Sequence, residues 1–162
     1  FDVSIIPVIK LISALFVHIF FIVFIMIMCL VYGYELSIFN IQALYYTFAT
    51  GVLTLGLSWL LSAVTVFFKD MTSLVNVCVQ IGFWVTPILW NEDTMVNESV
   101  KHALMLNPMH YIVNGYRNSF IFKKWFWETP QETIYFWVIT LLILVIGRIV
   151  FKRLKPFFAD EV

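Results

Sequence analysis

The chain has 162 residues, of which 62% are hydrophobic and only 12% are charged, and its formal net charge is zero. A soluble domain normally has about 25% charged residues, so a soluble fold would leave more apolar surface exposed than one small core could bury. The zero net charge also gives no electrostatic argument for a nucleic-acid partner. The composition therefore predicts a polytopic membrane protein.

Four apolar stretches that carry almost no charge follow one another along the chain. We expect transmembrane helices at about residues 11–32, 43–68, 72–90 and 133–151. Each has about the 20 residues that a helix needs to cross roughly 30 Å of hydrocarbon. The predicted fold is all-α, a bundle of four transmembrane helices with both ends of the chain on one side.

Basic residues near the ends of these stretches indicate the orientation. Lys10, Lys69 and a tail cluster around Lys152 flank the side that holds both chain ends. On the other side, Lys101 and Arg117 lie farther from the ends of the spans. Because basic residues close to spans mark the cytoplasmic side, we expect both ends of the chain in the cytoplasm.

Aromatic residues gather near the span ends on the other side. They include Tyr45 and Tyr46 at the start of the second span, Trp90 at the end of the third, and Trp125 and Trp137 around the start of the fourth. Rings with one polar group prefer the headgroup level of a bilayer. We therefore expect these residues to be interfacial anchors rather than ligand-binding groups.

The second and third spans contain residues that are unusual in a lipid-facing helix. Gly51 and Gly56 in the second would allow close helix packing. The third contains Gln80, Thr86 and Pro87, and its polar groups need protein or water around them. Because proline has no backbone donor, we expect this helix to kink or end near its last residues.

The segment between the third and fourth spans shows two short helical patterns, at about residues 96–106 and 108–121. Asn107 is a favoured N-cap and Pro108 suits the first helical position, so this pair ends one helix and starts the next. Neither helix is long enough to span. The pair either enters the membrane from the outer side and returns, packed on protein, or lies flat as an amphipathic pair on the outer surface.

The sequence lacks the common catalytic and metal-binding motifs. There is no phosphate-binding glycine-rich loop with Lys-Ser/Thr, no nucleophile elbow and no His-Glu-x-x-His motif. His18 stands alone in an apolar run, and Cys29 and Cys78 lack metal-like spacing. We therefore predict no catalytic site and no metal site in this chain, and we expect His18 to pack against protein or face a lumen.

Three motifs in chain order connect the sequence to a known family. They are Phe-Phe-Lys-Asp-Met at 67–71, Gly-Phe-Trp-Val-Thr-Pro-Ile-Leu-Trp at 82–90, and Leu-Asn-Pro-Met-His-Tyr-Ile-Val-Asn-Gly-Tyr-Arg-Asn-Ser at 106–119. Together they resemble type-2 ABC transporter permeases. The resemblance is closer to the branch that exports lipid-linked cell-surface polymers, namely teichoic acid, O-antigen and capsular polysaccharide.

The resemblance implies a subunit of six transmembrane helices, of which this chain would be the last four. It implies a homodimer in the bacterial plasma membrane, with an ABC ATPase partner that binds ATP and Mg²⁺, and no cofactor in this chain. The partners would be that ATPase, a second permease, membrane lipids and a lipid-linked polymer. The two short helices would form a re-entrant gate on the outer side. An exporter of a drug, peptide or small lipid is the alternative.

The resemblance also places three groups of candidate residues. The translocation path would contain Gln80, Phe83, Trp84 and Thr86, and the outer gate would contain Asn107, Pro108, Tyr111, Asn114, Tyr116 and Arg117. Lys69 and Asp70 would contact the ATPase, with an ordinary solvated loop as the alternative. The Arg117 guanidinium could bind a pyrophosphate or phosphate of the cargo through forked hydrogen bonds. A salt bridge to Glu92 or Asp93 is the alternative role for Arg117.

Overall fold

The computed structural model describes residues 3–68, 70–88 and 104–157, and every regular element in these residues is helical. The five α-helices are α1 (Ile6–Val31), α2 (Gln42–Phe67), α3 (Met71–Val85), α5 (Pro108–Arg117) and α6 (Pro130–Leu154). The short elements are η1 (Val3–Ile5), η2 (Ile38–Ile41), the π-helical turn η4 (Asn118–Phe122), η5 (Phe126–Glu128) and η6 (Lys155–Phe157). The all-helical prediction is confirmed.

Three of the described helices are long and apolar enough to cross a membrane. They are Ile6–Val31, Ile38–Phe67 and Pro130–Phe157, with 26, 30 and 28 residues. They correspond to the expected first, second and fourth spans. The first begins before the expected residue 11 because Pro7 lies in its first turn, a position that needs no backbone donor.

The third expected span is shorter in the structure than in the sequence prediction. α3 has 15 residues, about 22 Å of helix, against the roughly 30 Å of a hydrocarbon core. It ends at Val85 because Thr86 is extended, with ψ 132°, as expected for the residue before a proline. The prediction that this helix continues to residue 90 is therefore wrong for residues 86–88, which are not helical. Residues 89 and 90, and most of the expected helix at 96–106, lie outside the described residues.

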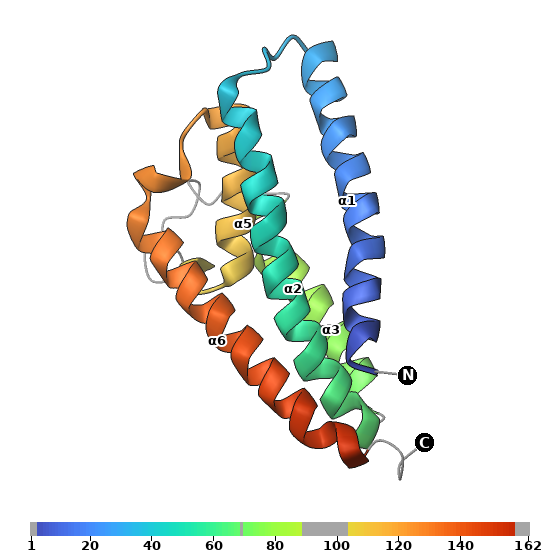
Figure 1. The fold of residues 1–162 in the computed structure, drawn as a ribbon. Coiled ribbons are helices and arrows are strands. Elements are labelled where there is room, and N and C mark those ends of the chain that lie inside the picture. Colours follow the sequence, from blue (N-terminus) through green and yellow to red (C-terminus); the bar gives the residue numbers. More distant parts are fainter. Residues whose placement is uncertain (1–2, 69, 89–103, 158–162) are drawn as a thin grey trace.

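Both ends of the described chain lie at one end of the bundle, together with the turn between α2 and α3 (Figure 1). We call this the basal end, and we call the opposite end, where Tyr32–Ser37 connects α1 to α2, the apical end. α2 is the central helix and contacts α1, α3, α5 and α6. α3 rises from the basal end, and α5 begins near its upper end, about halfway along α2, and continues toward the apical end (Figure 1).

The core lies in the apical half, where α2, α5 and α6 meet. Its buried members are Tyr46, Ala49, Leu53, Tyr111, Ile112 and Phe136. The rings of Tyr111 and Phe136 stack with their centroids 4.7 Å apart. The interpretation of Tyr46 as an interfacial anchor is wrong, because Tyr46 is 1% exposed. Tyr45 is half-buried and stacks on Phe126 with the ring centroids 4.4 Å apart.

In the basal half, α2 and α6 approach each other through two glycines. A Cβ on Gly147 would lie 2.4 Å from the carbonyl oxygen of Gly56, and a Cβ on Gly56 would lie 2.8 Å from Leu144 Cα. Gly51 has no such neighbour within 4 Å. The expected close packing at glycine therefore occurs at Gly56, because only there does another helix backbone fill the space that a side chain would need.

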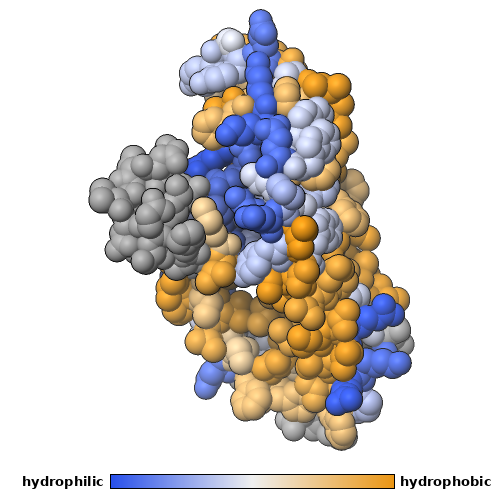
Figure 2. All heavy atoms as spheres, turned by 90° about the vertical axis from the view of Figure 1, so that its left-hand side faces the viewer, coloured by the Kyte–Doolittle hydropathy of each residue, from blue (hydrophilic) through white to orange (hydrophobic). Residues whose placement is uncertain are grey.

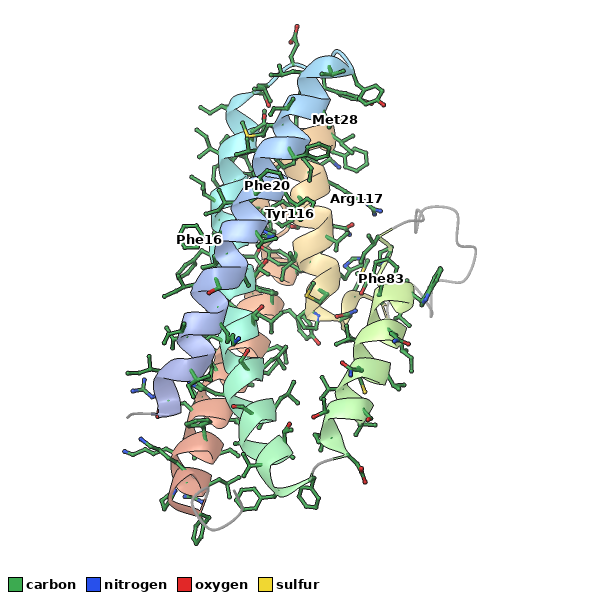
Figure 3. The ribbon with its side chains drawn as sticks, turned by 90° about the vertical axis from the view of Figure 1, so that its right-hand side faces the viewer. Phe16, Phe20, Met28, Phe83, Tyr116 and Arg117 are labelled. Atoms are coloured by element: carbon green, nitrogen blue, oxygen red, sulfur yellow. The ribbon has the colours of Figure 1, made fainter. Side chains whose placement is uncertain are left out.

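The outer surface of the helices is strongly apolar. Phe16 and Phe20 on α1 are 73% and 66% exposed, and their side chains point away from the bundle (Figure 3). Figure 2 shows a continuous apolar surface over the middle and lower part of the molecule, with hydrophilic residues at the upper end and again near the lower end. This distribution is that of a membrane protein with a polar region at each end.

Candidate functional site

The site begins at the corner where α3 ends and α5 starts. The Asn107 side-chain oxygen accepts a hydrogen bond from the backbone N–H of Met109 at 3.0 Å, so Asn107 caps α5 and Pro108 takes its first position, as the sequence predicted. The amide nitrogen of Asn107 donates to the Thr86 hydroxyl at 2.9 Å. Thr86 in turn donates to the carbonyl of Gly82 at 2.7 Å. One asparagine therefore both caps α5 and joins it to the end of α3.

Tyr111 fixes α5 against the two helices beside it. Its hydroxyl lies 3.1 Å from the Tyr45 hydroxyl and 3.0 Å from the Thr133 hydroxyl. Tyr45 also accepts from the indole nitrogen of Trp137 at 2.7 Å. Burial raises the pKa of Tyr111 above its ordinary value, so its hydroxyl stays neutral and able to donate. Tyr111 is 6% exposed, and its hydroxyl joins α5 to both α2 and α6.

Tyr116 connects α5 to α1. Its hydroxyl lies 2.7 Å from His18 Nε2 and 3.0 Å from the Thr47 hydroxyl. Because Thr47 donates to the carbonyl of Ala43 at 2.7 Å, it accepts from Tyr116. The Tyr116 oxygen then accepts from His18, which assigns the proton to Nε2 of the imidazole. The expectation that His18 packs against protein agrees with this contact.

Gly115 gives α5 its close approach to α2. A Cβ at this position would lie 2.0 Å from the Tyr46 ring, so any side chain would force that ring out of the core. Tyr46 occupies the space beside Gly115 because it lies on the face of α2 that meets α5.

Arg117 lies on the side of α5 away from Tyr116, above the end of α3 (Figure 3). Its Nη2 atom donates to the carbonyl oxygen of Ile88 at 3.1 Å, and its Nη1 atom lies 3.5 Å from the Asn114 side-chain oxygen. The Asn114 amide in turn lies 3.1 Å from His110 Nε2. Arg117 therefore braces the chain that follows α3. The alternative carboxylate partners, Glu92 and Asp93, lie outside the described residues.

The residues expected along the translocation path do not form one group. Gln80, Phe83 and Trp84 are exposed on α3, whereas Thr86 is 3% exposed and bonded to Asn107. Phe83 and Thr86 share an apolar groove of about 600 Å³ between α2 and α3. Asn107 also lines the groove, so the groove connects two of the expected path residues to the start of α5.

The two residues expected to meet the ATPase lie at the basal turn between α2 and α3. Asp70 is exposed there and directly precedes α3, so its carboxylate is accessible at the basal end. Lys69 lies outside the described residues. Among the described residues, no group of three or more His, Cys, Asp or Glu side chains could hold a metal ion.

Sequence reasoning missed Gln42, a buried polar residue at the start of α2. Gln42 is 3% exposed; its amide donates to the carbonyl of Lys124 at 2.8 Å and its oxygen accepts from the N–H of Phe126 at 2.8 Å. These bonds fix the segment that follows η4 against the start of α2. The sequence signal for this was spacing, since the buried face of α2 repeats at intervals of three or four residues, at Gln42, Tyr46, Ala49, Leu53 and Gly56. In membrane bundles such faces pack on protein.

The comparisons with known proteins agree with the membrane architecture. Residues 2–121 match the family described as ABC-2 type transporter. Two O-antigen export system permease proteins RfbA from Klebsiella pneumoniae are 28% and 29% identical over 109 and 110 residues. One from Myxococcus xanthus is 24% identical over 110 residues. Each match covers 67% of this chain and 40% to 42% of the relative, so the chain corresponds to less than half of those proteins.

Proposed function

The chain belongs to the ABC-2 type transporter family, and we propose that it serves in the ATP-driven export of a lipid-linked cell-surface polymer. It is a transmembrane component of a transporter. The observation that carries the cargo proposal is the similarity to three O-antigen export permeases. Teichoic acid, O-antigen and capsular polysaccharide are the polymers we consider.

The proposed mechanism follows from how α5 is held. One side of this helix is bonded to α1 and α2 through Tyr116, and its first residue is bonded to the end of α3 through Asn107. α3 itself starts at the basal turn beside Asp70. A displacement of that turn is therefore passed along α3 to the start of α5, which makes α5 the element that opens an outer exit.

The exposed residues of α3 suit a hydrated polymer. Phe83 and Trp84 are 44% and 70% exposed, and aromatic rings can contact sugar rings without holding one position. Gln80 on the same helix adds an amide that can exchange hydrogen bonds with hydroxyl groups. Arg117 would meet a phosphate of the cargo when its bond to Ile88 opens, because a guanidinium binds phosphate through two parallel bonds.

The proposed assembly places ATP and Mg²⁺ in a separate ABC ATPase that contacts the basal turn at Lys69 and Asp70. Two permeases would form the path between them. The basal end would face the cytoplasm of a bacterium, since Lys10, Lys152 and Arg153 lie at that end and basic residues near spans favour the cytoplasmic side. Both ends of this segment would then be cytoplasmic.

The test uses the full-length permease together with its own ATPase, in a strain from which the permease gene has been deleted. We expect the deletion to leave polymer inside the cell and the intact gene to restore it at the surface, measured with an antibody or lectin on unpermeabilised cells. Normal surface polymer in the deletion strain, with accumulation of a drug, peptide or small lipid instead, would establish the alternative cargo. An ATPase that does not co-purify would contradict the assembly.

A further inference from the structure

A second pocket, of about 400 Å³, lies at the basal end of the bundle, away from the gate. It is lined by Ser4, Trp59, Arg148, Phe151, Lys152 and Lys155. Three of these six side chains are cationic and none is acidic. Two others are aromatic, so the pocket combines positive charge with apolar walls.

The pocket is held open by contacts among its own lining residues. The guanidinium carbon of Arg148 lies 5.9 Å from the centre of the Trp59 ring, within the range of a cation–π contact. The Trp59 indole donates to the carbonyl oxygen of Ser4 at 3.3 Å, which ties the start of α1 to α2. Phe151 is 4% exposed and forms part of the floor. Arg148 therefore has a fixed aromatic neighbour while its N–H groups remain able to bind an anion.

The position of the pocket along α6 corresponds to the boundary between hydrocarbon and headgroups. Arg148 lies six residues before Leu154, the last residue of α6, which is about 9 Å of helix. Long basic side chains at this depth extend toward the interface, where lipid phosphates lie. Basic pockets between transmembrane helices bind anionic lipid headgroups for this reason.

We propose that this pocket binds the phosphate group of a lipid in the leaflet around the basal end, with Arg148 and Lys152 as its principal ligands. Arg148 would bind phosphate oxygens through its forked N–H groups, and Lys152, one helical turn later, would add a second positive charge. Trp59 and Phe151 would contact the glycerol and first methylene groups. The site is separate from the gate, and it does not depend on which cargo the transporter carries.

The test is a binding titration of the full-length permease by native mass spectrometry, with phosphatidylglycerol as the probe and phosphatidylcholine as the neutral reference. We expect Lys152→Gln and Arg148→Gln each to weaken phosphatidylglycerol binding about fivefold, the effect of one cation near a lipid phosphate. Arg153→Gln is the matched control, because it removes the same charge from the next residue, which does not line the pocket. Lys152→Arg should retain binding.

Two further probes separate the sources of the phosphate. Undecaprenyl diphosphate that binds in a Lys152-dependent manner, without binding of phosphatidylglycerol, supports the site and identifies a lipid-linked cargo as its ligand. Binding of both lipids supports the site for bilayer phospholipid. The proposal is overturned if Arg153→Gln weakens binding as much as Lys152→Gln, if inorganic phosphate competes as well as lipid, or if neither lipid binds. The melting temperature without lipid shows that each variant is folded.

Discussion

The Nε2 atom of His18 lies 2.7 Å from the hydroxyl oxygen of Tyr116, across 98 residues of sequence. The two rings meet edge to face, with centroids 5.7 Å apart. His18 lies in α1 and Tyr116 lies in α5, so one hydrogen bond joins these two helices. Because a polar group inside a membrane bundle needs a protein or water partner, this contact helps to fix α5 against α1.

The first prediction concerns that hydroxyl. Tyr116→Phe keeps the ring but leaves His18 and Thr47 without this partner, and we expect the free energy of unfolding to fall by about 1–3 kcal/mol, the cost of an unsatisfied buried polar group. Thermal unfolding of the full-length permease in detergent measures the change. Tyr32→Phe is the matched control, since Tyr32 is 73% exposed. Equal melting temperatures for Tyr116→Phe and Tyr32→Phe would show that the Tyr116 hydroxyl does not stabilise the fold.

A second prediction separates the two roles of Asn107. Asn107→Asp keeps the oxygen that caps α5 but loses the amide that donates to Thr86, whereas Asn107→Ala loses both. We expect Asn107→Ala to be the less stable of the two by about 0.5–2 kcal/mol, the usual value of an N-cap. If the link to α3 transmits motion, both variants reduce polymer export. Wild-type export by Asn107→Asp would mean that the gate does not depend on the bond to Thr86.

A third prediction compares the effect on stability of adding a methyl group at two glycines, one inside the contact between α2 and α6 and one outside it. Gly147→Ala places a methyl group 2.4 Å from the Gly56 carbonyl oxygen, and we expect a loss of about 1–3 kcal/mol from overpacking. Gly51→Ala meets nothing within 4 Å, so it should be neutral or stabilise the helix by about 0.5–1 kcal/mol. Thermal unfolding compares the pair. A stable Gly147→Ala variant would contradict the close packing of these helices.

Arg117 provides the prediction most directly concerned with transport. Arg117→Ala in the complete permease should reduce polymer export while dimer and ATPase assembly remain intact, because the side chain braces Ile88 from outside the core. Arg117→Lys retains the charge but loses the forked geometry that phosphate recognition needs. Export assays on cells expressing each variant measure the effect. Full export by Arg117→Ala would remove this residue from the path, and full export by Arg117→Lys would reduce its role to charge alone.

Labelling of single cysteines tests the orientation. In a background without Cys29 and Cys78, a cysteine at Lys123 should react with a membrane-impermeant maleimide on intact cells. A cysteine at Asp70 should react only after permeabilisation. Both positions are exposed, so access depends on the side of the membrane and not on burial. The reverse pattern would place the basal end outside the cell.

Much of the architecture was readable from the sequence because the membrane imposes simple requirements. Length and lack of charge predicted spans at about residues 11–32, 43–68 and 133–151. The structure has helices there, at Ile6–Val31, Ile38–Phe67 and Pro130–Phe157. The chemistry of Asn and Pro predicted the start of α5, where the cap is observed. Proline also explains why α3 stops at Val85, although the sequence prediction extended it to residue 90. These features depend on interactions within a few residues, which local sequence contains.

The pairing of residues from distant helices was decided by the tertiary structure. The sequence alone predicted that Tyr46 is an interfacial anchor. The packing of α5 on α2 shows instead that the Tyr46 ring fills the space beside Gly115. In the sequence His18 stands alone in an apolar run, and only the tertiary structure identifies Tyr116 as its hydrogen-bond partner. Composition and periodicity state which groups must avoid lipid, but they do not state which partner satisfies each group. That choice depends on helix rotation and depth, which the packing of α2 against α5 and α6 sets.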